Sequence, residues 1–283
     1  MPELPEVETV RRGLEQRTTG MVLQRLEVLR ERTIAAPADS QSFVEALQGK
    51  RIKAWTRRGK YLLASLNSAT GDEAAGHWGV HLRMTGQFLL VKEPIPICRH
   101  TRVRIWDPEG VELRFIDMRC FGQMWWVPPA EAPETQITGL KRLGPEPFDA
   151  EFNAEYLRRT LKATQRPIKS ALLDQSLVAG VGNIYADESL FASGLRPHTP
   201  AKRLELMQLE RLRQALVRVL EASIGAGGTT FSDFRDLTGT NGNYGGVAMV
   251  YRRHGQPCHR CGTTILRDRI GGRSSHWCPH CQP

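Results

Sequence analysis

The sequence predicts an α+β protein of more than one domain: a β-rich N-terminal half with a leading helix, then a helical half that ends in a zinc ribbon. Three observations predict this fold class. Short apolar runs, several with period-two alternation, fill residues 22 to 127. Apolar residues at helical spacing dominate residues 150 to 224, and four cysteines stand in two C-x2-C pairs at the end. A chain of 283 residues is long enough for two separate cores.

The first element is a helix over residues 5 to 18, where Val7, Val10 and Leu14 share one face and Gly20 ends the segment. The strands that follow are separated by Gly, Pro and Asp turns, of which the turn at 107 to 110 is the clearest. Such short strands form a sandwich or a barrel. The expected strands are 60–66, 87–91, 102–106, 111–115 and 123–127.

A proline-rich stretch interrupts periodic structure between residues 128 and 147. We therefore expect an N-terminal domain over residues 1–135, a linker over 136–149, a helical domain over 150–247 and a zinc finger over 248–283. The expected helices of the third part are 150–162, 167–176, 181–193 and 201–224.

The terminal cysteines have the spacing of a four-thiolate zinc site: Cys258-x2-Cys261, sixteen residues, then Cys278-x2-Cys281. Gly262 suits the tight turn after the first pair. The alternative, two disulfides, is disfavoured because the acidic N-terminus has no secretory signal. The remaining two, Cys98 and Cys120, are expected to be buried or incidental thiols.

The charge favours a polyanionic partner, since 39 basic residues face 30 acidic ones and the pI is about 9.5. From residue 252 onward six arginines face one acid, a net charge of +5. A hairpin carrying Arg267, Arg269 and Arg273 could grip a nucleic-acid backbone, or could simply be solvated. No apolar stretch approaches the roughly 20 residues that span a bilayer. We expect no membrane contact and a cytoplasmic protein, or a nuclear or organellar one in a eukaryote.

The N-terminus carries a candidate nucleophile. Removal of Met1 would leave Pro2 as a free secondary amine, and α-amino groups titrate at roughly pH 7.7 to 8.0. Such an amine can attack a carbonyl-like carbon to give an iminium, and Glu3 and Glu6 could move protons beside it. The alternative is that these acids merely favour the positive end of the first helix.

A glycine-rich turn precedes the expected helix at 181–193. Gly180 and Gly182 flank it, so the early N–H groups of that helix, with Asn183, could meet a phosphate. Helix packing explains such glycines equally well, and the Lys-Ser/Thr of a phosphate-binding loop is missing.

Seven motifs, in order from residue 2 to the end, resemble those of bacterial formamidopyrimidine-DNA glycosylases. One is the cysteine ribbon. The others are Pro2-Glu-Leu-Pro-Glu-Val-Glu-Thr, Arg58-Gly-Lys60-Tyr-Leu-Leu, His81-Leu-Arg-Met-Thr-Gly86, Asp117-Met-Arg-Cys-Phe-Gly122, Leu143-Gly-Pro-Glu-Pro147 and Gly180-Val-Gly-Asn-Ile-Tyr-Ala186.

The resemblance implies an N-terminal β-sandwich, a helix-two-turns-helix domain, a finger with one structural Zn²⁺, and a monomer that binds double-stranded DNA. It implies excision of 8-oxoguanine and formamidopyrimidines through a Pro2 Schiff base, then β,δ-elimination at the abasic site. Glu3 would donate a proton at the opening sugar and Glu6 would support the site. Lys60 would serve β-elimination and Arg273 δ-elimination, and both would bind phosphate.

The resemblance also implies a set of DNA contacts and a gap-filling device, which base extrusion requires. A loop over residues 225–246 would close over the flipped base. The gap would be filled by Met84, Arg119 and Phe121, although Met84 and Phe121 could instead be core residues. The remaining DNA-binding positions are His100, Asn183, Lys169 and Arg166.

The sequence departs from the family pattern at two positions. Arg83 stands where a glycine is usual, and Cys120 where a second basic residue is common. Two other functions share much of this pattern: a glycosylase of the same superfamily for oxidised pyrimidines, and a non-catalytic zinc-ribbon protein that binds DNA.

Overall fold

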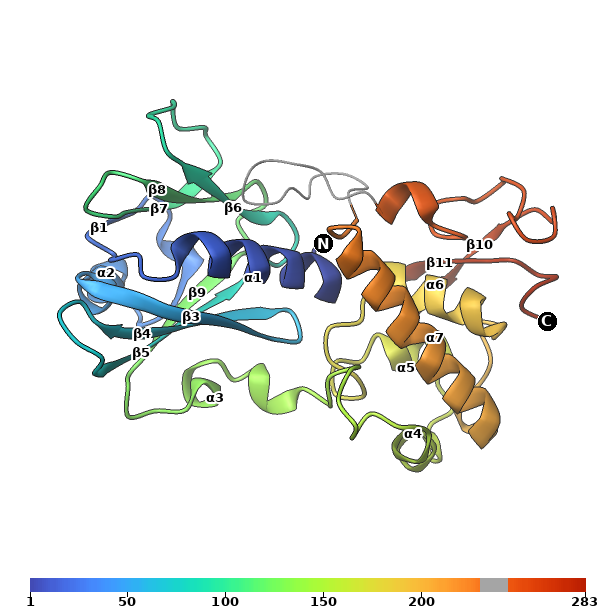
Figure 1. Cartoon of the computed structure of the whole chain (residues 1–283). Coiled ribbons are helices and arrows are strands. Elements are labelled where there is room, and N and C mark those ends of the chain that lie inside the picture. The colour runs from blue at the N-terminus through green and yellow to red at the C-terminus, as the bar shows by residue number, and fades with distance from the viewer. Residues whose placement is uncertain (230–243) are drawn as a thin grey trace. The chain divides into compact units, whose positions relative to one another are not determined.

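The computed structural model describes residues 1–229 and 244–283, and these form two compact units (Figure 1). The N-terminal unit holds residues 1–141 together with the described residues 227–229. The C-terminal unit holds residues 142–226 and 244–283. The expected loop at 225–246 therefore lies largely outside the described residues.

The N-terminal unit begins with helix α1 (Leu4–Thr18), which buries Leu4, Val7, Val10 and Leu14 on one face. Pro5 is tolerated because it stands in the first turn, where no intrahelical partner exists for its missing N–H. The helix packs along strand β3 (Lys50–Arg58), where the indole Nε1 of Trp55 donates to Thr18 Oγ1 at 2.9 Å.

In the described part of this unit, nine strands follow in two sheets, and all neighbouring pairs are antiparallel except β2 with β9. The five-stranded sheet has the order β2 (Ile34–Ala36), β9 (Gln123–Val127), β5 (Ala74–His81), β4 (Tyr61–Ser68) and β3. The four-stranded sheet has the order β1 (Arg25–Val28), β7 (Thr101–Trp106), β8 (Glu112–Asp117) and β6 (Gly86–Val91).

The two sheets face each other across one aromatic core, which makes the unit a sandwich rather than a barrel. Trp78 on β5 meets Phe88 on β6 edge to face, with ring centroids 5.9 Å apart, and Trp55 lies 5.3 Å from Trp78. Truncating such a side chain to alanine costs about 3–5 kcal/mol, so these rings hold the sheets together. The predicted sandwich with a leading helix is confirmed.

Among the described residues of this unit, two helices were not expected: α2 (Ser40–Leu47) and the short α3 (Pro133–Gln136). Helix α2 interrupts the β-rich stretch, because the Asp39 carboxylate caps it by accepting from the Ser42 N–H at 2.7 Å. Phe43 and Leu47, one helical turn apart, are both buried. The remaining short elements are the 3₁₀ turns η1 (Glu31–Thr33) and η2 (Leu140–Arg142).

The C-terminal unit is helical and carries a terminal hairpin, as predicted. Its helices are α4 (Ala154–Leu161), α5 (Ile168–Leu172), α6 (Asn183–Ser193) and α7 (Leu206–Gly225). The 3₁₀ turns η3 (Ala201–Arg203) and η4 (Tyr244–Val247) and the strands β10 (Leu266–Ile270) and β11 (Arg273–Trp277) complete it.

Helix α6 is the centre of this unit, since nearly all of its side chains are buried. Helix α7 packs on it through the predicted apolar face that includes Leu209, Leu212, Leu216 and Leu220. Among the described residues, no helix combines the length and apolar composition that a membrane crossing requires.

Candidate nucleic-acid interface and metal centre

The start of helix α1 is held by a reciprocal pair of glutamates. The Glu3 N–H donates to Glu6 Oε2 at 2.8 Å, and the Glu3 side chain accepts from the Glu6 N–H, which together form a capping box. Both carboxylates are buried, with 3% and 1% of their surface exposed. Pro2 is buried beside them, whereas Met1 is 40% exposed. Pro2, Glu3 and Glu6, the predicted nucleophile and acids, therefore lie together in one buried corner of the N-terminal unit.

A second segment closes this corner. Glu6 Oε1 accepts from the Thr229 N–H at 2.8 Å. Gly228 has φ +81°, and a Cβ at that position would lie 3.2 Å from Glu6 Cγ and Oε1. Only glycine suits both the backbone conformation and this close approach. The glycines at 225–228, first read as part of a loop, thus bring residues 227–229 onto the helix start.

The predicted Lys60 lies at the turn between β3 and β4 and is 7% exposed. Gly59 before it has φ +57°, and its carbonyl accepts from Arg57 Nη1 at 2.9 Å. Arg57 Nε also lies 3.2 Å from Glu8 Oε2 on α1, so one arginine ties the turn to the helix. Burial raises the pKa of Glu8, but hydrogen bonds from Arg11 and Arg12 more than compensate and hold it below its usual value.

His81 is a neighbour of Lys60 that the sequence did not single out. Burial, together with the positive charges of Arg83 and Lys60, lowers the pKa of His81 to about 3. Its Nδ1 accepts from the Arg83 N–H at 2.9 Å, and its ring meets Tyr61 edge to face at 4.6 Å. The imidazole is therefore neutral across the physiological range.

The loop after β8 presents two of the three predicted gap-filling residues, Arg119 and Phe121, and the turn between β5 and β6 carries the third, Met84. The buried Asp117 accepts from the Arg119 N–H at 3.2 Å, from the Gly122 N–H at 2.7 Å and from the Thr85 hydroxyl. The Arg119 guanidinium stacks 5.0 Å above the Phe121 ring. Phe121 is 42% exposed and is not a core residue. Met84 is half-buried.

Both departures from the family pattern fall on backbone with positive φ. Arg83 has φ +52° and Cys120 has φ +55°, a left-handed conformation that favours glycine. This geometry explains why glycine is common at the first position. Cys120 is half-buried and Cys98 is exposed, so of the two expected alternatives, a buried or an incidental thiol, Cys98 is not the buried one.

His100 is half-buried between two arginines of the same segment. Arg99 Nε lies 3.2 Å from His100 Nε2, and Arg102 Nη2 lies 3.5 Å from its Nδ1. Arg102 Nε also donates to the Asp117 carbonyl at 2.8 Å, which links this segment to the loop after β8.

In the C-terminal unit, Asn183 is the first residue of α6, after the predicted turn in which Gly180 has φ +85°. Its Nδ2 lies 3.4 Å from the Ser274 hydroxyl on β11, while its Oδ1 has no hydrogen-bond partner among the described residues. The start of α6 and the hairpin therefore meet at the Asn183 side chain, whose Oδ1 accepts no hydrogen bond from the described residues.

Lys169, which the resemblance implied as a DNA contact, lies inside the C-terminal unit. It is fully buried, and its Nζ lies 2.6 Å from both Asp187 Oδ1 and the Ser274 carbonyl. From this position no part of the ammonium group reaches the surface. Lys169 holds β11 against α6 in this structure, and its contact with DNA stays a prediction.

Asp187 and Glu188, two neighbouring acids on α6, attach the finger and the segment before it. Asp187 also accepts from the His276 N–H at 2.9 Å and from the Ser275 hydroxyl at 3.2 Å. Glu188 accepts from three consecutive backbone N–H groups, at residues 249 to 251. Burial raises the pKa of Glu188, although these donors oppose that effect. No sequence pattern indicated that these two acids are buried.

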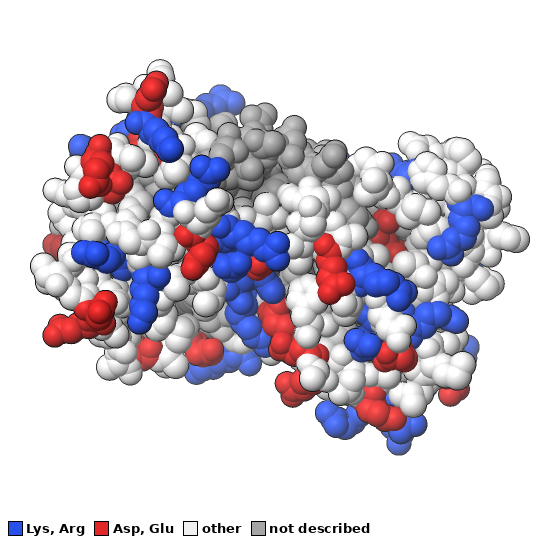
Figure 2. Space-filling model, viewed as in Figure 1, with Lys and Arg blue, Asp and Glu red and all other residues white. Residues whose placement is uncertain are grey.

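The two remaining predicted contacts are exposed. Arg166 pairs with Asp174 at 2.9 Å, with half of its side-chain surface open to solvent. Arg273 is the first residue of β11, after the Gly271-Gly272 turn, as the hairpin prediction placed it. On the face drawn in Figure 2, basic and acidic side chains are interspersed, so the net charge of +9 does not form one continuous patch there.

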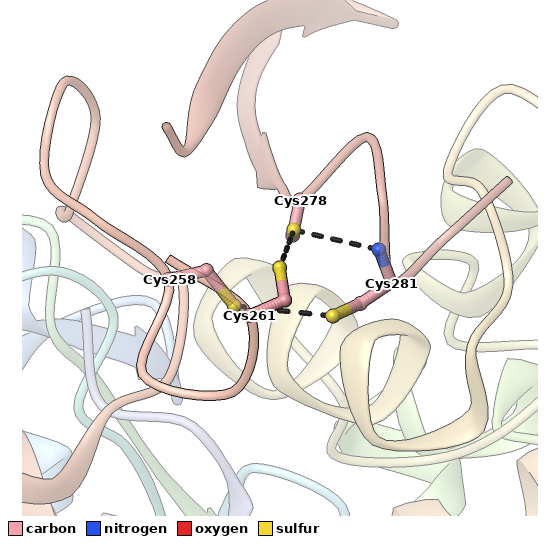
Figure 3. Close-up of side chains that lie close together, drawn as sticks. All are labelled: Cys258, Cys261, Cys278 and Cys281. Carbon is pink, nitrogen blue, oxygen red and sulfur yellow. Dashed lines mark hydrogen bonds between the residues drawn. The ribbon is translucent and has the colours of Figure 1, made fainter. Parts of the chain in front are cut away.

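The four terminal cysteines converge as predicted, and Figure 3 shows their sulfurs pointing toward one another. All four Sγ atoms lie within 4.8 Å of one another, with Cys258 to Cys281 at 3.9 Å and Cys261 to Cys278 at 3.5 Å. Zn–S bonds of about 2.3 Å in a tetrahedron require S···S distances close to these. The residues therefore fit one structural Zn²⁺.

Hydrogen bonds attach the four-cysteine site to the rest of the C-terminal unit. Gly262 has φ +76°, which permits the turn after Cys261. Gln282 accepts from the Cys278 N–H at 2.9 Å and donates to the Leu195 carbonyl at 2.8 Å. With no open coordination position, such a site supplies folding energy rather than catalysis.

Comparisons with known proteins agree with this arrangement along the chain. Three family models match: the formamidopyrimidine-DNA glycosylase N-terminal domain at residues 1–124, its H2TH domain at 143–235, and a zinc finger found in FPG and IleRS at 255–283. The chain is 62% identical over 282 residues to a formamidopyrimidine-DNA glycosylase of Parasynechococcus marenigrum, with both chains covered fully. It is 63% identical over 283 residues to that of a Synechococcus strain, covering 99% of it.

Among solved structures, the fold is similar to a Lactococcus lactis FPG mutant in complex with DNA that contains Fapy-dG. The TM-score is 0.89 at 32% identity, and 99% of each chain is covered.

Proposed function

The chain belongs to the formamidopyrimidine-DNA glycosylase family, and we propose that it excises oxidised purines from DNA and then cleaves the strand at the abasic site. Its substrates are 8-oxoguanine and formamidopyrimidines in double-stranded DNA. The observation that carries the proposal is the buried capping box directly behind Pro2, in a chain that matches glycosylases over its full length.

The nucleophile is the Pro2 amine. It attacks C1′ of the damaged nucleotide, the C1′–base bond breaks, and the base leaves with a proton. The amine then holds the sugar as an iminium. This step requires removal of Met1, whose exposure leaves it open to an aminopeptidase. An N-terminal extension would block the chemistry without disturbing the fold.

Glu3 and Glu6 divide the remaining work of this corner. Glu3 donates a proton to the ring oxygen as the sugar opens. Glu6 is a positioning residue, because its two oxygens already accept from the N–H groups of Glu3 and Thr229. Glu6 therefore fixes the backbone on which Pro2 and Glu3 stand, and joins it to the segment that leads into the expected loop.

Strand cleavage follows from the iminium by two eliminations, in which the 3′ and then the 5′ phosphate leaves. Lys60 serves the first and Arg273 the second, and each binds phosphate. The ion pair of Arg57 with Glu8 supports the Lys60 role, since it fixes the turn that carries Lys60 to the helix that carries the nucleophile.

Base extrusion leaves a gap, which Met84, Arg119 and Phe121 fill. The stacking of Arg119 on an exposed Phe121 supports this assignment, because an aromatic ring left in water at a loop tip is available to enter a base stack. His100, Asn183 and Arg166 bind the DNA backbone. The cysteine site holds the finger on which Arg273 stands. As a repair enzyme of a cyanobacterial type, the protein acts on the chromosome in the cytoplasm.

The test is borohydride trapping on a duplex that contains 8-oxoguanine, with Met1-processed protein. A reducible iminium at Pro2 predicts a covalent protein–DNA adduct, and the same protein with an added N-terminal residue is the matched control. No adduct from the processed protein would refute the catalytic proposal and leave a DNA-binding protein. Faster cleavage of thymine glycol than of 8-oxoguanine would instead assign the chain to oxidised pyrimidines.

A further inference from the structure

The C-terminal unit has a hollow that the proposed chemistry does not use. It lies between the finger hairpin and the residues that follow α6, and its volume is about 690 Å³. Sites for small molecules and their fragments range over roughly 300–1,000 Å³, so the hollow has room for more than one polar group. Its charged and aromatic lining consists of Arg196, His198, Arg203, Asp268, Arg269 and Trp277.

Three guanidinium groups line this hollow, from Arg196, Arg203 and Arg269, and all three residues are exposed. Within residues 1–229 and 244–283, none of them forms a salt bridge with a carboxylate. Like charges gathered in one concavity repel one another and attract an anion from solution. The hollow thus has a strong local preference for negative charge.

The one carboxylate in the lining is already engaged. Asp268 Oδ2 accepts from Trp277 Nε1 at 2.6 Å and lies 3.5 Å from His198 Nε2. Asp268 therefore orients the buried indole and the imidazole, and neutralises at most one of the arginines. The three arginines and Asp268 together give the lining a net charge of +2.

The floor of the hollow positions one guanidinium in advance. The Arg196 Cζ lies 4.5 Å from the centroid of Trp277, whose side chain is only 4% exposed. A cation stacked on a buried indole loses fewer rotamers when it binds a ligand. Arginine suits phosphate because its planar fork donates two parallel hydrogen bonds.

We propose that this hollow is a second phosphate site, which binds a backbone phosphodiester of the DNA away from the lesion. The proposal rests on the proposed function, since that function brings DNA to the same hairpin. Arg269 stands one residue before the end of β10, and its cross-strand partner Ser274 directly follows Arg273 on β11. A DNA strand that Arg273 holds therefore lies near this phosphate-binding hollow, because Arg269 in its lining is only four positions from Arg273 in the chain.

The experiment compares Arg203→Gln and Arg269→Gln with Arg218→Gln, which removes one positive charge from an exposed position on α7 outside the hollow. The affinity of each variant for a lesion-containing duplex is measured across a salt series. Each phosphate contact contributes about 0.9 to the slope of log K against log salt. We expect each hollow variant to lower the slope by about that amount, and Arg218→Gln to leave it unchanged.

Equal slopes for all three variants would overturn the proposal, provided that zinc content and circular dichroism show folded protein. A second arm titrates wild type and Arg269→Gln with pyrophosphate in the absence of DNA. Pyrophosphate binding that only the wild type shows, together with an unchanged DNA slope, would replace the DNA backbone by a free phosphate ligand. Wild type that binds DNA with the full slope but excises no base would refute the proposed function and leave this site intact.

Discussion

The neutral state of His81 makes a quantitative prediction about pH. The imidazole has a pKa of about 3 in the folded protein, because it is buried and faces the charges of Arg83 and Lys60. An unfolded chain protonates its histidines near pH 6.5. Below pH 6.5 the unfolded state therefore binds one more proton, and stability falls as the pH falls toward 3. At pH 5, about 1.5 units below the unfolded pKa, the loss is about 2 kcal/mol.

The substitution His81→Asn isolates this contribution. An asparagine oxygen can accept from the Arg83 N–H as Nδ1 does, and it does not titrate. The loss of the contact with Tyr61 lowers stability equally at every pH. Wild type should therefore lose about 2 kcal/mol more than the variant between pH 7.5 and pH 5.

The assay is urea unfolding followed by tryptophan fluorescence at the two pH values. Five of the six tryptophans lie in the N-terminal unit, so the signal reports mainly the unit that contains His81. Carboxylates that titrate in this range contribute equally to both proteins and cancel in the comparison. The same pH dependence in wild type and variant would refute the reasoning and place the His81 pKa near its ordinary value.

Three further predictions concern the groups that hold the site. Cys258→Ser, or a chelator, should abolish DNA binding but leave the tryptophan unfolding transition of the N-terminal unit unchanged; retained affinity would reject the role of the finger. Asp187→Asn removes the carboxylate that pairs with the buried Lys169 ammonium group, and should lower the free energy of unfolding of the C-terminal unit by about 3–5 kcal/mol. The measurement is the rate of zinc release, which should rise. The double variant Asp187→Asn with Lys169→Met should release zinc more slowly than Asp187→Asn alone. Equal rates of zinc release would argue against the ion pair. Asp117→Asn leaves one acceptor oxygen for the Gly122 and Arg119 N–H groups, which two oxygens of Asp117 serve, and should weaken DNA binding and speed exchange of at least one of these amides by about tenfold or more; unchanged exchange of both amides would contradict its role.

The sequence predicted the order of the elements well, because periodicity and turn residues are local signals. The strand at 123–127 and the apolar face of α7 appear where they were expected. The boundaries were less accurate. Residues 201–205 form a 3₁₀ turn and a cap rather than the start of α7, since the Glu205 capping box begins the helix one residue later.

The four zinc ligands could be predicted because their spacing alone carries the chemistry. The burial of Lys169, by contrast, could not, because its partner Asp187 is eighteen positions away and the Ser274 carbonyl is more than a hundred away. A lysine in a basic chain resembles any other phosphate contact until its surroundings are known. The same limit applies to His81, whose pKa depends on its burial and on the charges of Arg83 and Lys60 rather than on its own motif.

Buried carboxylates perform one common task near the candidate site residues. Glu6, Asp117, Asp187 and Glu188 each accept from backbone N–H groups of irregular segments or of the finger hairpin. Such segments lack the ladder of hydrogen bonds that a helix or sheet provides, and a buried N–H without a partner costs about 1–3 kcal/mol. A charged acceptor with two oxygens satisfies several such donors at once.

This arrangement explains how exposed functional side chains can stand on short loops and still be positioned. Asp117 accepts from the backbone N–H groups of Arg119 and Gly122, and so fixes the segment that carries Arg119 and Phe121. Arg273 lies two residues before Ser275, whose hydroxyl donates to Asp187. The side chains that would meet DNA are therefore free to move only about their own bonds, while the backbone beneath them is fixed. Of the buried acids near the candidate site residues, Glu3 has the proposed catalytic role of proton donor. The others hold the backbone segments that carry the functional side chains.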